Sequence, residues 1–147
     1  MADVRKVVLV ECSARELFDL VDDVEAYPDF LPWCGGTQVL ERTDHRTVAT
    51  LHINYHGVKA HFTTCNEKQP PTAMQMHLRD GPFKKLEGQW VFKQLGDVGC
   101  KVEFYLHYEF ANRLLEKVVG PVFSHIATTF VDAFVRRASQ IKTPGKQ

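Results

Sequence analysis

The chain has 147 residues, of which 44% are hydrophobic and 24% are charged, and ten of them are phenylalanine. This length suffices for one folded domain with a substantial core, and we expect that domain to span residues 1–142. Lys plus Arg and Asp plus Glu are equal at 18 each, so the formal net charge is zero. The basic surplus typical of a broad nucleic-acid-binding surface is therefore absent.

The remaining bulk features concern compartment and metal binding. No segment contains 18 consecutive apolar residues, so we do not expect a transmembrane helix. The N-terminal residues enter a strand pattern at once, without an apolar leader, which predicts a cytoplasmic protein. The cysteines form no C-x-x-C pair, so we expect free thiols and no metal site; they are Cys12, Cys34, Cys65 and Cys100.

The first predicted element is a strand over residues 3–11. Its apolar residues alternate only loosely, because Val8 and Val10 lie on one side and Val7 and Leu9 on the other. We therefore expect both faces of this strand to be partly covered.

Two short helices are predicted next. Ser13, followed three residues later by Glu16, forms a capping-box pattern that predicts a helix over residues 14–21. Pro28 prevents a long continuation, so we expect a second short helix that ends near Leu31.

Strand patterns then dominate as far as residue 110. A turn is predicted at Gly35–Gly36 and a tight turn at His56–Gly57, and short turns of this kind favour an antiparallel meander. Each strand has one apolar and one polar face, which predicts a sheet covered on one side only. The predicted strands cover residues 37–42, 47–55, 58–66, 74–78, 86–93 and 100–110.

The last predicted element is a long apolar helix over about residues 112–138. Its apolar side is broad and aromatic, so it needs a large partner, which the strands must supply. Gly120–Pro121 interrupts the pattern and predicts a kink, and residues 143–147 are predicted to form a flexible tail. The predicted fold class is α+β, with a curved seven-stranded antiparallel sheet around the long C-terminal helix. That geometry can enclose a cavity.

The candidate ligand-binding site is the inward-facing apolar set of this sheet and helix. Methionine side chains adapt to variable apolar guests, and Tyr and Trp add polar groups that can meet a ligand carbonyl. Each residue can equally be packed core, and the sequence does not decide between these interpretations. The candidates are Phe30, Leu31, Trp33, Leu51, Ile53, Phe62, Met74, Met76, Leu78, Trp90, Phe92, Phe104, Leu106, Tyr108, Val119, Val122, Phe123, Ile126 and Phe130.

No catalytic residue is assigned. Acid–base catalysis needs titratable groups that converge inside a pocket, and no nucleophile elbow, H-E-x-x-H motif or phosphate-binding glycine loop occurs. Alternation places the strand histidines on the outer face, as solvated groups or, alternatively, as a metal site across strands; they are His52, His61, His77 and His107. The acids after the first helix are interpreted as a solvated loop cluster: Asp22, Asp23 and Glu25.

The basic residues of the second half are the candidates for contact with a charged partner. Arg113 and Lys117 share one side of the terminal helix by their i,i+4 spacing. An ordinary solvated face is one interpretation, and an anionic partner, either rRNA or phospholipid, is the other. The full set is Lys84, Lys85, Lys93, Arg113, Lys117, Arg136 and Arg137.

Several strings along the chain resemble one family. The predicted elements follow the order of one strand, two short helices, six strands and one long helix, and this order resembles the helix-grip fold. The strings closely resemble the coenzyme Q-binding protein and ribosome association toxin family of the START-like, polyketide cyclase/dehydrase superfamily. They occupy residues 13–21, 23–34, 62–64, 80–92 and 120–123.

This resemblance implies two alternative roles. One is non-catalytic binding of ubiquinone or a similar polyprenyl lipid, in support of respiration, with the lipid as ligand and no cofactor. The other is binding to the large ribosomal subunit to block subunit association. A cyclase-like enzyme is a third alternative. We expect the lipid-binding role, in the cytoplasm, with peripheral contact at the inner face of the membrane as a further alternative; the oligomeric state is left open.

Overall fold

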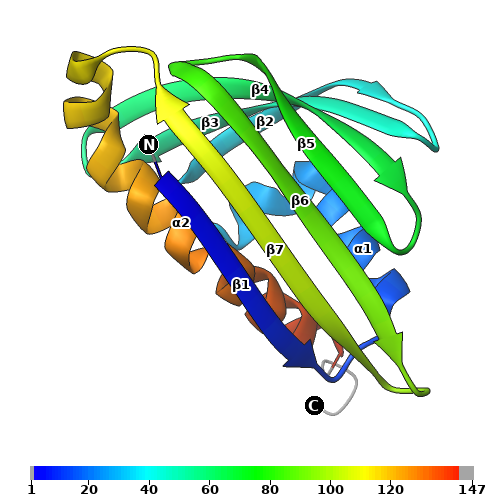
Figure 1. The fold of residues 1–147 in the computed structure, drawn as a ribbon. Coiled ribbons are helices and arrows are strands. Elements are labelled where there is room, and N and C mark those ends of the chain that lie inside the picture. The colour runs from blue at the N-terminus through cyan, green and yellow to red at the C-terminus, as the bar shows by residue number, and fades with distance from the viewer. Residues whose placement is uncertain (1, 143–147) are drawn as a thin grey trace.

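The computed structural model describes residues 2–142 (Figure 1). A seven-stranded antiparallel sheet curves around one long C-terminal helix, which confirms the predicted α+β helix-grip fold. The predicted tail, 143–147, lies outside the described residues. The elements are β1 (Ala2–Val10), α1 (Ala14–Asp22), the 3-10 helix η1 (Val24–Asp29), β2 (Cys34–Arg42), β3 (Arg46–Tyr55), β4 (Val58–Gln69), β5 (Ala73–Asp80), β6 (Phe83–Leu95), β7 (Gly99–Phe110) and α2 (Arg113–Lys142).

The sheet is a meander whose first strand closes against its last. The strand order is β1-β7-β6-β5-β4-β3-β2, and every neighbouring pair is antiparallel. The predicted tight turn between β3 and β4 is confirmed, because His56 and Gly57 both have positive φ, at 51° and 79°. Two residues of positive φ match the twist that a short hairpin requires.

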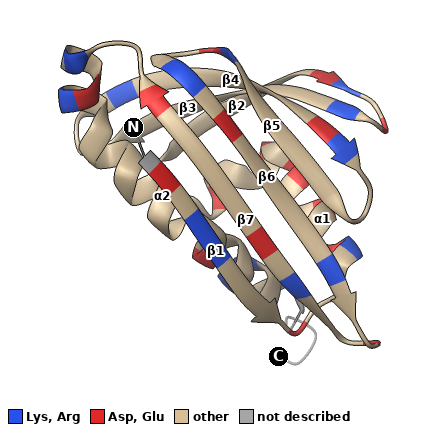
Figure 2. Ribbon diagram, viewed as in Figure 1, with Lys and Arg blue, Asp and Glu red and all other residues tan. Residues whose placement is uncertain are grey.

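The helix α2 lies against the concave face of the sheet (Figure 1). Its charged residues are confined to the two ends, and the segment 118–131 carries none (Figure 2). Phe123, Ile126 and Phe134 are at most 3% exposed, so the inward side of the helix is part of the hydrophobic core. Burial of such side chains stabilises the fold by about 1.5–3 kcal/mol each.

By length and composition alone, residues 113–141 of α2 form a helix that could cross a membrane, because an 18-residue window within it has a mean hydropathy of 1.5. In this structure the same segment is the core helix of the sheet. The helix continues through Pro121, which has no N–H to donate to the carbonyl of Lys117. The kink expected there stays a prediction.

The first short helix begins as its sequence predicts. The N–H of Glu16 donates to Ser13 Oγ at 3.1 Å, and the N–H of Ser13 donates to Glu16 Oε1 at 2.9 Å. This reciprocal capping box fixes the direction of α1. The helix then packs against both α2 and β6 at one end of the sheet.

Two predictions about the edge strands were wrong. Gly35 and Gly36 lie within β2, where the register with β3 shifts, so the chain makes a bulge there and not a turn. Val7 and Leu9 of β1 are 62% and 73% exposed, because no second layer covers the outer face of the sheet.

The inner face of the sheet is apolar except along one stretch of β4 and at Thr47 of β3. Thr64, Asn66 and Lys68 alternate on that face, and each is 7% exposed. The expectation of a wholly apolar inner face was therefore wrong for this strand. The buried polar stretch lies towards α1, because Lys68 contacts Asp22.

Candidate functional site: a cavity between the sheet and the C-terminal helix

A cavity of about 60 Å³ lies between the inner face of the sheet, α2, and the α1–η1 segment. Its walls are mainly apolar, with a few polar groups from η1 and β4. It is lined by Val21, Val24, Tyr27, Trp33, Ala49, Leu51, Phe62, Thr64, Asn66, Met76, Leu86, Trp90, Phe104, Leu106, Phe123, Ile126, Ala127 and Phe130.

More than half of the candidate ligand-binding residues meet at this cavity. Strand alternation and helix periodicity place their side chains on the facing surfaces of the sheet and α2. Contact of these residues with a ligand stays a prediction. The group comprises Trp33, Leu51, Phe62, Met76, Trp90, Phe104, Leu106, Phe123, Ile126 and Phe130.

The other candidates do not line the cavity. Leu78 and Val122 are half-buried against the core. Phe30, expected at the mouth, packs edge-on against Phe134 at 5.2 Å and lies under the guanidinium of Arg137 at 5.3 Å. The remaining ones are buried core outside the cavity: Leu31, Ile53, Met74, Phe92, Tyr108 and Val119.

The candidate set also missed part of the lining. Val21, Val24 and Tyr27 come from α1 and η1, whose approach to the sheet no local pattern reveals. The other missed residues share the inward phase of their strand or helix. Four of them are small or polar, so apolarity did not select them, whereas Leu86 has the apolar character that could have selected it. These missed residues are Ala49, Thr64, Asn66, Leu86 and Ala127.

Trp90, which lines the cavity, carries an unpartnered polar atom. Its side chain is 1% exposed and stacks on Phe92. The ring of Phe104 packs against it at a tilt, with the ring centroids 4.7 Å apart. The Nε1 of Trp90 is buried and has no hydrogen-bond partner among residues 2–142. A buried donor without an acceptor costs about 1–3 kcal/mol, so a ligand atom that accepts from Nε1 recovers that free energy.

Tyr27 is the titratable side chain of the lining, considering the described residues. Its hydroxyl donates to the carbonyl oxygen of Val21, and burial raises its pKa far above the ordinary value. The phenol is therefore neutral at physiological pH, and its proton is held in the hydrogen bond to Val21.

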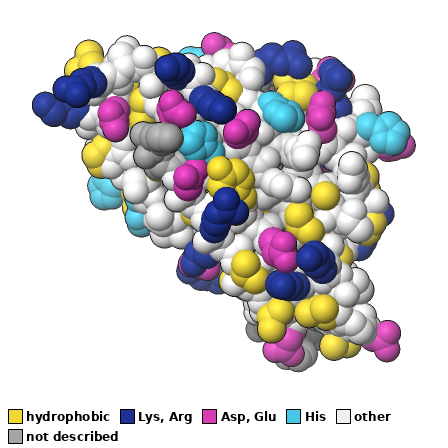
Figure 3. Space-filling model, viewed as in Figure 1, with side chains coloured by type: hydrophobic (Ala, Val, Ile, Leu, Met, Phe, Trp, Pro, Cys, Tyr) yellow, Lys and Arg dark blue, Asp and Glu magenta, His cyan; other side chains and the backbone are white. Residues whose placement is uncertain are grey.

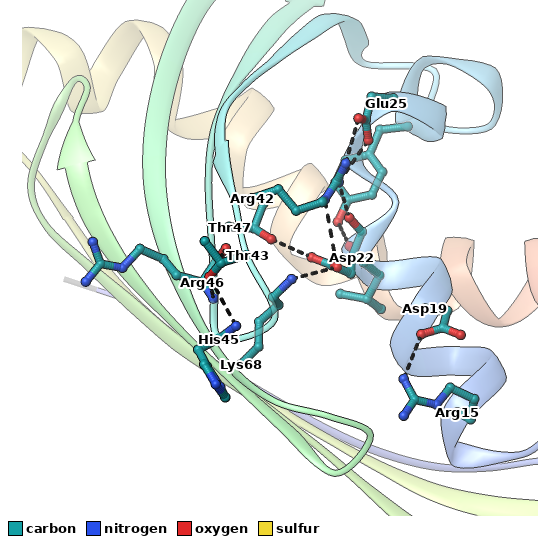
Figure 4. A network of polar contacts seen from close by, with 12 residues as sticks. Arg15, Asp19, Asp22, Glu25, Arg42, Thr43, His45, Arg46, Thr47 and Lys68 are labelled. Carbon is teal, nitrogen blue, oxygen red and sulfur yellow. Dashed lines mark hydrogen bonds and ion pairs between the residues drawn. The ribbon is translucent and has the colours of Figure 1, made fainter.

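A charged cluster connects the end of α1 and η1 to the sheet (Figure 4). Lys68 Nζ donates to Asp22 Oδ2 at 2.9 Å, and the Thr47 hydroxyl donates to Asp22 Oδ1 at 2.8 Å. Arg42 holds Glu25 through two bonds of 2.7 and 2.9 Å and also donates to the carbonyl oxygen of Asp22. These bonds tie α1 and η1 to strands β2, β3 and β4.

The prediction of solvated acids was wrong for Asp22, which is largely shielded, and is confirmed for Asp23 and Glu25, which are exposed, the latter at 54%. The side chains of Lys68 and Asp22 are 4% and 18% exposed, so their ion pair is largely shielded from water. The bonded guanidinium of Arg42 lowers the pKa of the Glu25 carboxyl. The cluster therefore carries structural ion pairs that fix the end of α1 over the sheet.

The prediction that His107 is solvated was also wrong. This residue is 8% exposed and lies between two carboxylates, with Asp3 Oδ1 at 2.6 Å and Glu109 Oε2 at 2.9 Å. Hydrogen bonds to Glu109 and Asp3 raise the pKa of His107 above 6.5, and the same bonds lower the pKa of both carboxyls. The imidazolium thereby links the edge strand β1 to β7.

This arrangement predicts a pH-dependent contribution to stability. The contribution of His107 is complete below its unfolded pKa of about 6.5 and is lost as pH rises through the raised folded value. The contributions of Asp3 and Glu109 are complete above about pH 4.5 and are lost as pH falls. We expect the urea midpoint of His107→Gln to fall furthest below wild type between about pH 4.5 and 6.5, with a smaller gap at pH 9.

The control for this pH series is His45→Gln, because His45 is an exposed loop histidine. Its midpoint should track wild type at every pH. A gap for His107→Gln that is constant from pH 5 to pH 9 would contradict the charged link.

The remaining strand histidines lie at two separate places on the sheet. His52 and His61 lie directly opposite on β3 and β4, with ring centroids 5.7 Å apart. His77 is remote from this pair and lies 3.9 Å from Glu67. Within residues 2–142 no group of three His, Cys, Asp or Glu side chains is placed to hold a metal ion. All four cysteines are free thiols, as expected.

Comparison with known proteins gives consistent matches in sequence and fold. Residues 10–135 match the family model described as polyketide cyclase / dehydrase and lipid transport. The chain is 41% identical over 141 residues to the ribosome association toxin RatA of Vibrio cholerae, covering 96% of this chain and 98% of that protein. It is 28% identical over 134 residues to the coenzyme Q-binding protein COQ10 homolog B, mitochondrial, of Xenopus laevis, covering 88% of this chain and 54% of that protein.

Two solved structures show the same architecture. The Zhui aromatase/cyclase from Streptomyces sp. R1128 superposes with a TM-score of 0.77 at 18% identity, over 95% of this chain and 94% of that one. The 18 kDa protein CC1736 from Caulobacter crescentus gives 0.72 at 27% identity, over 97% and 99%. The chain therefore belongs to the polyketide cyclase/dehydrase and lipid transport family, within the group that contains the ribosome association toxins and the coenzyme Q-binding proteins.

Proposed function

We propose that this protein binds ubiquinone or a similar polyprenyl lipid in the cavity between the sheet and α2, without catalysing its conversion. The observation that carries the proposal is the unpartnered Nε1 of Trp90, a residue of the mainly apolar lining. A quinone ring presents carbonyl oxygens that accept hydrogen bonds, and its tail is hydrocarbon. The distant relative named as a coenzyme Q-binding protein supports the same ligand class.

The energetics favour such a ligand once the cavity opens. Each buried methylene contributes about 0.8 kcal/mol, so a few isoprene units supply roughly 10 kcal/mol before association costs of several kcal/mol. The cavity of about 60 Å³ is smaller than the ~300–1,000 Å³ of a typical ligand site. Binding therefore requires lining side chains to move apart, and a long tail extends beyond the cavity.

The composition of the lining supports binding over catalysis. General acid–base chemistry needs a titratable group with a free proton site facing the substrate. Tyr27, the titratable side chain of the described lining, already donates its proton to Val21 and has a raised pKa. The similarity to an aromatase/cyclase concerns the fold, at 18% identity.

Filling the cavity tests this function. Ala127 is 2% exposed, and the added carbons of Ala127→Leu occupy the space next to Phe123 and Trp90. We expect this variant to lose at least tenfold in affinity for a short-chain ubiquinone, measured by native mass spectrometry and by quenching of tryptophan fluorescence. A polyprenyl hydrocarbon of equal length, which lacks the carbonyls, should bind wild type more weakly than the quinone does.

The matched control is Ala133→Leu, which changes the same helix outside the cavity. Its quinone affinity should equal that of wild type. If wild type takes up neither quinone nor hydrocarbon, or if Ala127→Leu binds as tightly as wild type, the cavity is not the binding site.

The similarity to proteins named as ribosome association toxins favours a second function, binding to the ribosome in the cytoplasm. The identity of 41% extends over nearly the whole chain, so surface as well as core residues are shared. Overexpression followed by sucrose-gradient profiles tests this role. Cosedimentation with the 50S fraction and a loss of 70S particles support it, and an unchanged profile contradicts it. Ala127→Leu separates the two functions, because filling the interior leaves the outer surface unchanged.

A further inference from the structure

The first turns of α2 expose aliphatic side chains beside basic ones. Leu114 and Val118 are 70% and 53% exposed and share one side of the helix by i,i+4 spacing. Arg113 and Lys117 form a parallel row next to them and are also exposed. The two side chains form a small aliphatic patch bordered by basic residues.

The start of β6 lies next to these turns and adds to the same surface. The N–H of Ala111 donates to the carbonyl oxygen of Pro82 at 3.0 Å, which places Lys84 near the beginning of α2. Figure 3 shows basic and hydrophobic side chains side by side at this end of the molecule. We define the docking surface as Lys84, Arg113, Leu114, Lys117 and Val118.

The charges of the docking surface are available to a partner. Within residues 2–142, neither Lys84 nor Arg113 nor Lys117 forms an ion pair. Of the neighbouring acids, Glu109 bonds to His107 and also interacts electrostatically with Lys84, and Glu116 is exposed on the same helical turns as Arg113 and Lys117. The surface therefore has a local positive excess although the whole chain is neutral.

We propose that the docking surface binds the anionic surface of a lipid bilayer. Basic side chains pair with lipid phosphates, while Leu114 and Val118 enter the boundary between headgroups and hydrocarbon. A nucleic-acid backbone offers phosphates but no apolar layer for two exposed aliphatic side chains. This inference rests on the proposed lipid-binding function, because the bilayer is the source of a polyprenyl ligand.

The docking surface is connected to the cavity by a layer of aromatic rings. Gly120 contacts Phe110, where an added Cβ would lie 3.7 Å from the ring. Phe110 stacks on Phe83 at 5.0 Å, and Phe83 packs on Phe123 at 4.8 Å. Phe123 itself lines the cavity. These aromatic rings therefore lie between this end of α2 and the cavity wall.

Vesicle cosedimentation tests the proposal with full-length protein and quinone-free vesicles. We expect binding to vesicles of phosphatidylcholine with 30% phosphatidylglycerol and at least tenfold weaker binding to phosphatidylcholine alone. Arg113→Glu/Lys117→Glu and Leu114→Glu/Val118→Glu should each weaken binding to the anionic vesicles at least tenfold. All four positions are exposed, so circular dichroism and thermal melting should match wild type.

The matched controls carry the same changes elsewhere. Arg136→Glu reverses a charge at the other end of α2, and Leu40→Glu alters a 63% exposed side chain of β2. Both should bind vesicles as wild type does.

The proposal is overturned if wild type does not bind anionic vesicles, if the double variants bind normally, or if the double variants lose only binding to ribosomal RNA. Quinone uptake measured in detergent micelles does not depend on vesicle binding. It therefore tests the proposed lipid-binding function separately from the docking surface.

Discussion

Replacing Lys68 by alanine is expected to lower the free energy of unfolding by about 3 kcal/mol, measured by urea denaturation at pH 7. The change leaves the carboxylate of Asp22 in a largely buried position without its ammonium partner at 2.9 Å. Thr47 and Arg42 still contact Asp22, which keeps the loss at the lower end of the range for buried ion pairs.

Two further variants isolate the cause of that loss. Lys59→Ala changes an exposed lysine of the same strand and should shift stability by less than about 0.5 kcal/mol. The double variant Asp22→Asn/Lys68→Met removes both charges and should recover a large part of the stability. A loss for Lys68→Ala no greater than that for Lys59→Ala would contradict a structural role of the pair.

Phe134→Ala is expected to destabilise the protein by about 4 kcal/mol, because it removes a fully buried ring from the centre of an aromatic cluster. The ring contacts Phe130 at 4.9 Å, Tyr27 and Phe30 at 5.2 Å each, and Trp90 at 5.6 Å. These contacts join η1, the sheet and α2 at one point. Thermal and urea unfolding monitored by circular dichroism measure the effect.

The comparison for this variant is Ile141→Ala, which truncates a 52% exposed side chain of the same helix. It should cost less than about 0.5 kcal/mol, since most of its surface is already in water. A loss below about 1.5 kcal/mol for Phe134→Ala would mean that the cluster collapses into the vacated space without a lasting cavity.

The inward face of the sheet was predictable because strand periodicity is local. Side chains alternate with a period of two, so Leu51, Trp90 and Phe104 were assigned to the interior from their own strands alone. The structure places all three at the cavity. Alternation predicts which face of the sheet a side chain occupies, but it does not predict where in the interior the side chain lies. Met74 and Phe92 are therefore buried on the predicted face and yet lie outside the cavity.

The charged cluster could not be predicted, because its partners are distant in sequence. Lys68 shares the inward phase of β4, but a lysine is placed inside a protein only when a carboxylate meets it there. That carboxylate belongs to Asp22, 46 residues earlier, and the packing of α1 on the sheet brings the two together. His107 was misassigned for the same reason, since Asp3 reaches it from a strand 104 residues away.

Pro121 bears on how quickly a ligand exchanges. The helix lacks the hydrogen bond from position 121 to the carbonyl of Lys117, and this gap falls two residues before Phe123 of the cavity wall. We therefore expect residues 113–120 to separate from the sheet more readily than the remainder of α2, with the buried side chain of Val119 as the main contact to break. We expect ligand exchange to follow this local opening, on a timescale far shorter than that of global unfolding. The rate of access is then set by a hinge in the helix and not by the stability of the whole protein.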